Sequence, residues 1–302
     1  MFDNTLLTIA PEVAAALAAN QPVVALESTV IAHGLPRPQN FEGALRLQEI
    51  VRDAGAVPAT VAIINGKLRV GITNDELRLL AETDNIKKIS TRDLPIAVAK
   101  SWNGATTVAS TAWIARRAGV RVFATGGIGG VHRGPLPDIS ADLPELARTP
   151  IVVVCSGAKI VLDLNATREW LETHGITVVG YQCEEMPAFY SRNSGLPVDV
   201  RADTPGEVVE LFQTQNILGI EAALLVTVGV PLEFELSAAK LWGVLEEALA
   251  EAMRLSISGR ELTPFLLAHM AKGSEGATLR ANISLLENNA RVAAEIAGSL
   301  EE

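Results

Sequence analysis

The chain has 302 residues, of which 48% are hydrophobic, enough to bury a large core in one α/β domain. Its 25 Lys and Arg face 35 Asp and Glu, so the net charge of −10 disfavours non-specific binding to nucleic acid polymers or to anionic membranes. Without a basic leader or an apolar run of membrane-spanning length, we expect a cytoplasmic protein, in which an anionic substrate needs a local basic pocket.

Short β-branched runs alternate with longer helical patterns along the chain, which predicts a three-layer α/β/α fold around a mostly parallel sheet. The predicted strands are Val23–Leu26, Thr60–Ile64, Val120–Ala124, Ile151–Cys155, Thr177–Gly180 and Ala222–Val228. Asn65-Gly66 is a strong hairpin signal, so an antiparallel ribbon should be attached and the sheet should be mixed. Nothing marks a boundary or a linker, and residues 1–302 are therefore interpreted as one domain.

Glu27 follows the first predicted strand directly, at the strand end where α/β sheets bind ligands. Burial at that position would raise its pKa and suit it to proton transfer, although a carboxylate that caps a neighbouring loop is an equally good interpretation. Further along, the segments Lys87–Asp93 and Asn103–Val108 supply cations and small polar groups on loops.

The segment Ala124-Thr-Gly-Gly-Ile-Gly-Gly-Val-His-Arg-Gly134 follows the third predicted strand and is a candidate cradle for a phosphate or a base. It matches neither the dinucleotide-binding nor the Walker pattern, and a tight packing turn is the alternative. Downstream, Asp138 and Asp142 lie four residues apart with Ser140 between them. Oxygen ligands without nearby Cys or His indicate Mg²⁺ or Mn²⁺, the alternative being a solvated acidic turn.

Ser156-Gly-Ala-Lys159 lies between a buried strand pattern and a helical pattern over Ile160–Leu171. Ser156 is predicted to be the N-cap of that helix and Lys159 to lie in its first turn. There the helix dipole and partial burial would both favour a neutral, nucleophilic amine, whereas a lysine that reaches to water is the commoner outcome.

Two later helices are predicted from local signals. Thr204-Pro-Gly-Glu207 has the pattern of a capping box that opens a helix to about Asn216. In the other helix, which follows Leu236, six apolar residues fall on one face and indicate core packing. These are Leu241, Val244, Leu245, Ala248, Leu249 and Ala252. Cys155 and Cys183, the two cysteines, are expected to be core thiols.

Several long motifs occur together in order, among them Ala25-Leu-Glu-Ser-Thr-Val-Ile-Ala-His-Gly34, Gly104-Ala-Thr-Thr-Val-Ala-Ser-Thr111 and Asp138-Ile-Ser-Ala-Asp-Leu143. With them, the chain resembles the pseudouridine-5′-phosphate glycosidase family, also named indigoidine synthase A-like, over nearly its full length. The resemblance implies reversible cleavage of a carbon-carbon glycosidic bond, which gives uracil and ribose 5-phosphate.

The resemblance also implies roles for individual residues. Lys159 would form an imine with the ring-opened sugar, Glu27 would donate a proton, and Asp138 would hold Mn²⁺ largely through water, with Asp142 as the other possible direct ligand. Contacts to the substrate are implied for Lys88, Val108, Thr125, His132, Ser140, Ala141, Asp142 and Asn282. A homotrimer is the assembly that the resemblance implies.

Two segments depart from the family pattern. The spacer Pro135-Leu-Pro137 is shorter than expected and could alter the metal loop, and Val226-Thr-Val-Gly-Val-Pro231 replaces an expected Asn-Pro pair and could reshape the sugar pocket. Two alternatives therefore stand beside the glycosidase. One is a binding module for sugar phosphates or nucleotides, and the other is the same chemistry on another C-glycoside.

Overall fold

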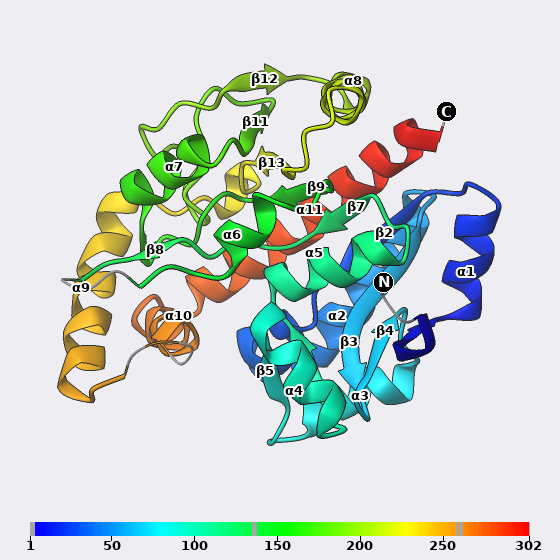
Figure 1. The fold of residues 1–302 in the computed structure, drawn as a ribbon. Helices are drawn as coiled ribbons and strands as arrows, with labels where there is room; N and C mark the ends of the chain where they lie inside the picture. The colour runs from blue at the N-terminus through cyan, green and yellow to red at the C-terminus, as the bar shows by residue number, and fades with distance from the viewer. Residues whose placement is uncertain (1–3, 135–137, 258, 260–261, 302) are drawn as a thin grey trace.

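The computed structural model describes residues 4–134, 138–257, 259 and 262–301. In this part of the chain, 11 strands form one mixed sheet, whose main path has the order β1-β4-β3-β2-β7-β9-β13-β11-β12, while β5 and β6 join it through β3 (Figure 1). The main-path strands are β1 (Leu7–Ile9), β2 (Val23–Leu26), β3 (Val57–Ile64), β4 (Lys67–Val70), β7 (Val122–Ala124), β9 (Val152–Cys155), β11 (Thr177–Tyr181), β12 (Val200–Ala202) and β13 (Leu224–Val228). The others are β5 (Lys87–Ile89) and β6 (Gly104–Thr106), and β8 (Val131–His132) pairs separately with β10 (Leu162–Asp163).

All neighbouring strands from β3 through β2, β7, β9, β13 and β11 to β12 are parallel. The antiparallel ribbon is formed by β3 and β4, and it turns at Asn65 and Gly66, whose φ angles of 49° and 74° both lie in the left-handed region that a two-residue hairpin turn requires. Each of the six predicted strands overlaps an observed one, so the predicted mixed, mostly parallel sheet is confirmed.

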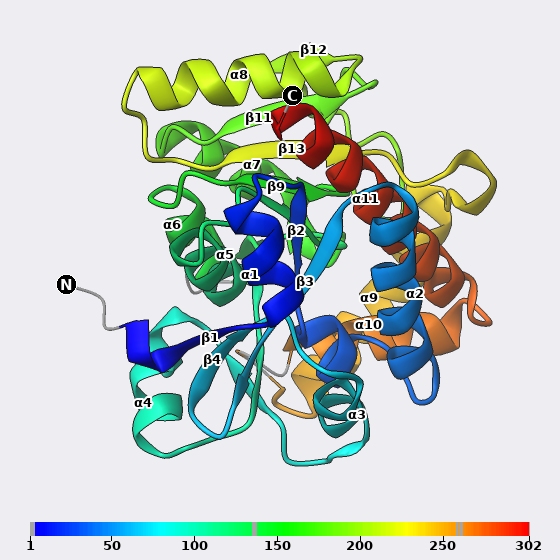
Figure 2. The same cartoon turned by 90° about the vertical axis from the view of Figure 1, so that its right-hand side faces the viewer.

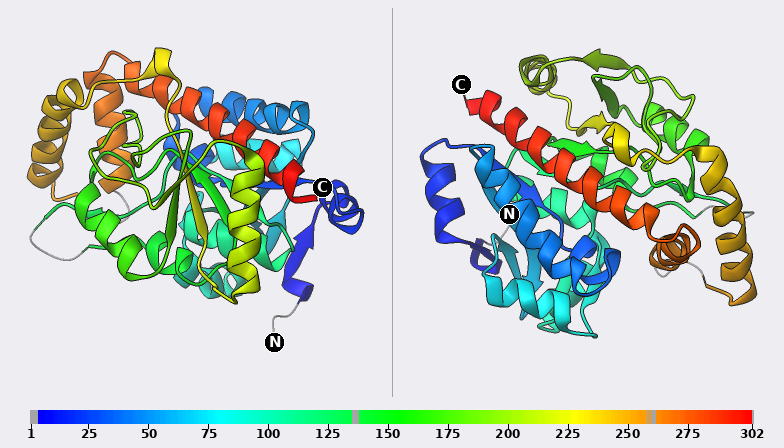
Figure 3. Two further views of the ribbon diagram at one scale, coloured as in Figure 1. Left: turned by 90° about the horizontal axis from the view of Figure 1, so that it is seen from above. Right: turned by 180° about the vertical axis from the view of Figure 1, so that it is seen from behind.

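Helices cover both faces of this sheet (Figure 2). On one face, α11 (Ala277–Glu301) packs against α2 (Gln39–Asp53), α8 (Pro205–Ile217) and the central strands, and Figure 3 shows it running diagonally across the back of the molecule. On the other are α1 (Pro11–Ala18), α5 (Val108–Arg117), α6 (Asp142–Leu146) and α7 (Leu164–Thr173). The three-layer arrangement is as predicted. Further helices are α3 (Asn74–Glu82), α4 (Leu94–Ala99), α9 (Ala238–Arg254) and α10 (Leu262–Gly273).

The main hydrophobic core joins the sheet to both helical layers and includes residues from Val13 to Leu300. It confirms the helix predicted after Leu236, because Leu241, Leu245, Ala248 and Ala252 of α9 are buried. Whether residues 1–302 act as one domain stays a prediction. Within the described residues, none of the helices combines the length and apolar character needed to cross a bilayer.

Local helix signals were confirmed in part. The Thr204 side chain caps α8 by accepting a hydrogen bond from the N–H of Glu207. The Glu207 carboxylate, however, accepts a hydrogen bond from the N–H of Asp203 and not from that of Thr204. The second hydrogen bond of the predicted capping box therefore comes from the residue before the N-cap. Burial raises the pKa of the Cys155 thiol to about 12, which agrees with a core thiol.

Candidate active site

A cavity of about 340 Å³ opens at the carboxyl ends of β2, β7 and β9. Parallel strands of an α/β sheet commonly present ligand-binding residues at this edge. The first residues of α5, the glycine-rich segment after β7 and the start of α10 form its walls. A cavity of this size fits a small molecule of about the dimensions of a nucleotide.

The structure gathers nearly all residues singled out by the sequence around this one cavity. Those that line it are Glu27, Lys88, Val108, His132, Asp138, Ser140, Ala141, Asp142, Lys159 and Asn282. Thr125 does not line it and lies just beneath, where its hydroxyl donates a hydrogen bond to Glu27. The spacer Pro135-Leu-Pro137 lies outside the described residues, and none of residues 226–231 lines the cavity, so the second departure does not reshape its wall.

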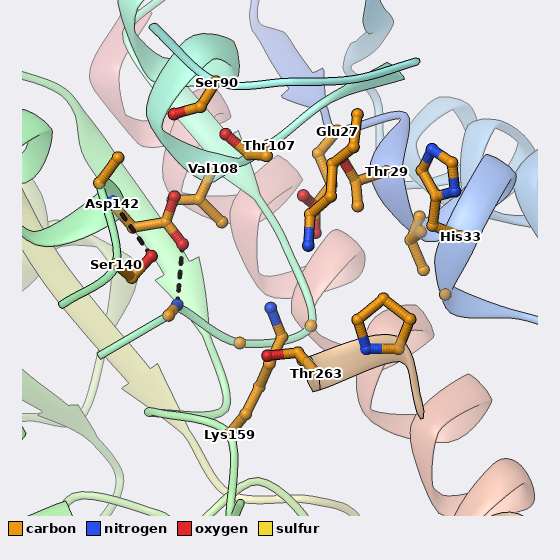
Figure 4. Close-up of a pocket in the computed structure, with 18 of the residues that line it drawn as sticks. Glu27, Thr29, His33, Ser90, Thr107, Val108, Ser140, Asp142, Lys159 and Thr263 are labelled. Atoms are coloured by element: carbon orange, nitrogen blue, oxygen red, sulfur yellow. Dashed lines mark hydrogen bonds between the residues drawn. The ribbon is translucent and has the colours of Figure 1, made fainter. Parts of the chain in front are cut away.

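Glu27 follows the last residue of β2 and is only 9% exposed, although it faces the cavity (Figure 4). Burial raises its pKa, and the charge of Asp142 acts in the same direction. Opposing effects come from the Lys159 charge, from the hydrogen bond of 2.6 Å that Thr125 donates to Oε1, and from Lys88. Burial is the largest of these, so Glu27 keeps a proton to higher pH than an exposed carboxyl and suits proton donation.

Lys159 reaches the cavity from a loop and not from a helix, so its predicted first-turn position is wrong. Gly157 has φ +76° and forms an isolated bridge to Ala188, while the N–H of Lys159 donates to the carbonyl of Ile128 at 3.2 Å. These contacts hold residues 156–159 in a non-helical path. The helix α7 begins instead at Leu164, and its N-cap is Asp163.

Because Lys159 lies outside a helix, the helix-dipole argument for its nucleophilicity fails. The remaining argument for a nucleophilic role is the position of Lys159, because its side chain points into the same cavity as Glu27 (Figure 4). A lysine opposite a buried carboxylic acid is an arrangement that can combine an amine nucleophile with a proton donor.

Asp142 is a buried structural carboxylate and not the solvated turn residue that was one sequence interpretation. It is 6% exposed, and its Oδ1 and Oδ2 accept hydrogen bonds from the N–H groups of Ala109 and Gly129, at 3.0 and 2.9 Å. It thereby joins the first turn of α5 to the glycine-rich segment. A side chain at position 129 would clash, because its Cβ would lie 2.2 Å from Ser140 Oγ.

Asp138 lies half-buried at the cavity wall, where its backbone carbonyl accepts from the N–H of His132. Among the described residues, no group of three or more His, Cys, Asp or Glu side chains is arranged to hold a metal ion. Since both Asp142 oxygens already accept backbone hydrogen bonds, Asp138 is the better-placed carboxylate for a cation. A single carboxylate fits a hard ion that keeps most of its water ligands.

His132 is half-buried in β8 and faces the same cavity. Burial lowers its pKa, the Asp138 charge opposes this effect, and the charges of Lys159 and Lys88 add to it. The imidazole is therefore neutral at pH 7, and it can donate one hydrogen bond and accept another.

Several cavity residues had no individual role predicted from the sequence. Ser90 and Arg92 come from the segment directly after β5, Thr107 is the N-cap of α5, and Thr29 and His33 lie on the helical turn after β2. Thr263 and Pro264 come from α10, more than 100 residues beyond Lys159 in sequence. The helix-capping position of Thr107 was detectable, whereas the approach of α10 depends on tertiary packing.

Phe189 is a further unexpected cavity residue, because its φ of +62° is unusual for a bulky side chain. The N–H of Phe189 donates to the carbonyl of Ser156 at 2.9 Å. A Cβ at Gly127 would lie 2.7 Å from the Phe189 ring, so the glycine leaves room for the ring at the cavity wall. Such a conformation gives no periodic signal in a sequence.

Comparison with known proteins agrees with this geometry. A family model described as indigoidine synthase A like protein matches residues 12–299. A protein of Hahella chejuensis named pseudouridine-5′-phosphate glycosidase is 50% identical over 299 residues, which cover 98% of this chain and 99% of the relative. A protein of the same name from Geobacillus kaustophilus is 49% identical over 299 residues, with 98% and 99% covered.

Two solved structures have the same fold. The crystal structure of the prealnumycin C-glycosynthase AlnA in complex with ribulose 5-phosphate superposes with a TM-score of 0.91, at 39% identity and with 99% of this chain and 98% of the other covered. An indigoidine synthase A-like protein of Thermotoga maritima gives 0.92 at 37% identity, with 100% and 99% covered. On the family match and the full-length relatives together, the chain belongs to the indigoidine synthase A-like family.

Proposed function

We propose that the chain is an enzyme that cleaves, or in reverse forms, the carbon-carbon glycosidic bond of pseudouridine 5′-phosphate, with uracil and ribose 5-phosphate as products. The observation that carries the proposal is the presence of Lys159 and the buried acid Glu27 in one cavity. The named relatives with about 50% identity over nearly the full length support the choice of substrate.

The difficulty of the reaction explains why an amine and an acid are both needed. A glycosidase that cleaves a carbon-oxygen bond can protonate the leaving oxygen, but a carbon leaving group offers no such lone pair. In the proposed reaction, the Lys159 amine bonds to C1′ and the ring oxygen O4′ leaves as a hydroxyl. The nitrogen lone pair then forms an iminium as the C1′–C5 bond breaks.

The electron pair of the broken bond goes to C5 of uracil, and C5 takes the proton of Glu27. Water next hydrolyses the iminium, which releases ribose 5-phosphate and restores the lysine. Burial of Glu27 serves this step, because a carboxyl with a raised pKa holds its proton to higher pH than an exposed one. In the synthetic direction the same residues act in reverse order.

The phosphate is proposed to bind where Lys88 and the N-terminus of α5 border the cavity. The backbone N–H groups of a first helical turn point towards an anion and carry partial positive charge. Val108 is the first residue of that helix, and Asn282 of α11 lines the same cavity. His132, with its neutral imidazole, is proposed to contact uracil at the other end of the substrate. Thr125 does not line the cavity, so it is proposed to act on uracil only through its hydrogen bond to Glu27.

A divalent metal, Mn²⁺ by preference, is proposed as a cofactor that Asp138 holds largely through water. The half-buried carboxylate at the cavity wall fits a hydrated hard ion. Such an ion supplies positive charge against an anionic substrate. Ser140 and Ala141, which line the cavity beside Asp138, are proposed to contact the substrate.

A homotrimer in the cytoplasm, built from single-domain chains of residues 1–302, is proposed for the assembly. Light scattering during gel filtration measures its mass directly, and a monomer or dimer would contradict it.

The second candidate function is the same bond chemistry on another C-glycoside. The structural neighbour named a prealnumycin C-glycosynthase favours it, since that protein has the same fold with a different named product. Identity to that neighbour is 39%, against 50% for the glycosidase relatives, so pseudouridine 5′-phosphate is the first choice. A simple binding module fits less well, because binding alone needs no buried acid opposite a lysine.

The test is borohydride reduction during incubation with pseudouridine 5′-phosphate, followed by peptide mass spectrometry and a uracil assay. We expect uracil release and an adduct on Lys159. Lys159→Arg keeps the charge but cannot form an imine, so it should give neither. Lys88→Arg is the matched control and should retain adduct formation at Lys159 with a raised KM. An adduct at Lys88, or turnover by Lys159→Arg, would contradict the mechanism.

A further inference from the structure

Asn289 is a fully buried polar side chain in the middle of α11, outside the wall of the cavity. Its exposed fraction is 0%, and the helix packs there against β7 and β9. A buried amide is costly unless its hydrogen-bonding groups find partners. The partners of Asn289 therefore indicate what this polar group does in an otherwise apolar interface.

The Asn289 side chain binds the two loops that leave β7 and β9. Its Nδ2 donates to the carbonyl of Thr125 at 2.9 Å and lies 3.4 Å from that of Gly126, in the loop after β7. It also lies 3.1 Å from Ser156 Oγ, in the loop after β9, and that hydroxyl lies 3.3 Å from Asn289 Oδ1. The Asn289 side chain thus links the loop after β7 to the loop after β9 by hydrogen bonds.

Each of these loops leads directly to a residue of the proposed chemistry. Thr125, whose carbonyl Asn289 holds, donates its hydroxyl hydrogen to Glu27 at 2.6 Å. Ser156 begins the non-helical path to Lys159, three residues further on. The N–H of Ser156 also donates to the carbonyl of Gly126 at 2.9 Å, so the loops are joined to each other as well as to Asn289.

We infer that Asn289 is a positioning residue that fixes the loop orienting Glu27 relative to the loop carrying Lys159. It touches neither the substrate nor the reacting atoms, and it acts through Thr125 and Ser156. The inference rests on the proposed function, because it assigns Asn289 to the geometry of that reaction. Displacements of about 1 Å between reacting groups cost on the order of 100-fold in rate, so a rigid link between the two loops matters for turnover.

The alternative is that Asn289 only supports the fold. The two roles predict different kinetics. A structural role lowers thermal stability and the active fraction, which leaves the pH profile and KM of the remaining enzyme unchanged. A positioning role lowers kcat in the folded enzyme and also alters the environment of Glu27, because Thr125 loses its anchor.

The main experiment compares Asn289→Leu with Asn288→Leu in uracil release from pseudouridine 5′-phosphate. Asn288 is the neighbouring half-buried asparagine on α11, and its amide contacts Gly229 and Arg291 instead of the two loops. We expect Asn289→Leu to lower kcat roughly 10- to 100-fold with little change in KM, because the proposed phosphate contacts are untouched. The control should keep kcat, and equal losses in both variants would overturn the inference.

The pH profile adds a readout that a structural role does not move. Glu27 must be protonated to act, so activity falls as pH rises through its pKa. The Thr125 hydrogen bond lowers that pKa, so its loss in Asn289→Leu or Thr125→Val should move the falling limb to higher pH. Besides Thr125, the groups that act on Glu27 are Lys159, Asp142 and Lys88. The shifts in the double variant should not add, and additive shifts would contradict the coupling.

Ser156→Ala keeps the inference testable if Asn289→Leu fails to fold. It removes only the link between Asn289 and the lysine loop. We expect slower borohydride trapping at Lys159 with the falling pH limb unchanged, and unchanged trapping would overturn the inference. If the wild-type protein itself releases no uracil, the proposed function fails. If the wild type is active and the Asn289 and Ser156 variants match it, the inference alone fails.

Discussion

The backbone path of the Lys159 loop depends on the absence of a Cβ atom at Gly157. Its φ is +76°, and a Cβ built there would lie 1.9 Å from the carbonyl oxygen of Pro187. Gly157→Ala therefore combines a backbone conformation that L-residues avoid with a steric clash against backbone. We expect the substitution to displace the loop that leads to Lys159.

The magnitude follows from these two contributions. The left-handed conformation costs an alanine about 1–2 kcal/mol. A clash that forces backbone to move costs about 1–3 kcal/mol in a well-packed interior. Together they lower the free energy of unfolding by about 2–5 kcal/mol, before an offset of about 0.4–1 kcal/mol because alanine restricts the unfolded chain.

Thermal unfolding followed by circular dichroism measures this loss, and Gly175→Ala is the matched control. Gly175 has φ +69°, but a Cβ there meets nothing within 4 Å, so that variant carries the backbone cost without the clash. At about 2 °C for each kcal/mol, Gly157→Ala should melt several degrees below the control. Its kcat should also fall roughly 10- to 100-fold. Equal melting temperatures in the two variants would refute the clash, and unaltered turnover would refute the role of the loop.

Further predictions concern the carboxylates of the site. Glu27→Gln should abolish both uracil release and borohydride trapping at Lys159, because the iminium forms only as the C1′–C5 bond breaks, and turnover at the wild-type rate would rule out the proton-donor role. Because burial raises the Glu27 pKa, its ionisation costs stability as pH rises above 4.5 through the folded-state pKa. The melting temperature of Glu27→Gln should therefore increase relative to that of the wild type as the pH rises through this range. A difference between the two that is the same at every pH would contradict this prediction. Chelation should remove the activity of the wild type, and Mn²⁺ should restore it better than Zn²⁺ does. Mn²⁺ should not restore the activity of Asp138→Asn. Full activity after chelation would exclude the metal from the mechanism. Asp142→Asn should lower the free energy of unfolding by about 1–3 kcal/mol, because one buried N–H loses its acceptor, whereas Asp138→Asn should leave it unchanged.

The sheet could be predicted because its signals are local and periodic. Val23–Leu26 is observed with the predicted limits, and the Asn65-Gly66 turn is determined by two residues that adopt positive φ angles. Burial patterns of strands and of α9 follow from their own residues in the same way. The strand-end position of Glu27 was then enough to place it near a ligand site.

The Lys159 loop could not be predicted, because its conformation depends on distant partners. Ser156 has the residue type of a helix cap, yet its hydroxyl bonds to Asn289, 133 residues away. The bridge between Gly157 and Ala188 is equally non-local. Tertiary contacts therefore override the local helix signal, and the helix starts only at Leu164.

The chain is acidic overall, but it places basic side chains at the cavity, where they can bind an anion. Although the net charge is −10, Lys88 and Lys159 both face the cavity, and Glu27 lies where both of their charges act on it. In an open site, two lysines would hold that carboxyl ionised and useless as a proton donor. Burial after β2 outweighs them, so the same cavity can combine Lys88 for a phosphate, the Lys159 amine and a carboxylic acid that keeps its proton to higher pH than an exposed one. The depth of Glu27 in the sheet is thus as much a part of the proposed chemistry as its carboxyl group.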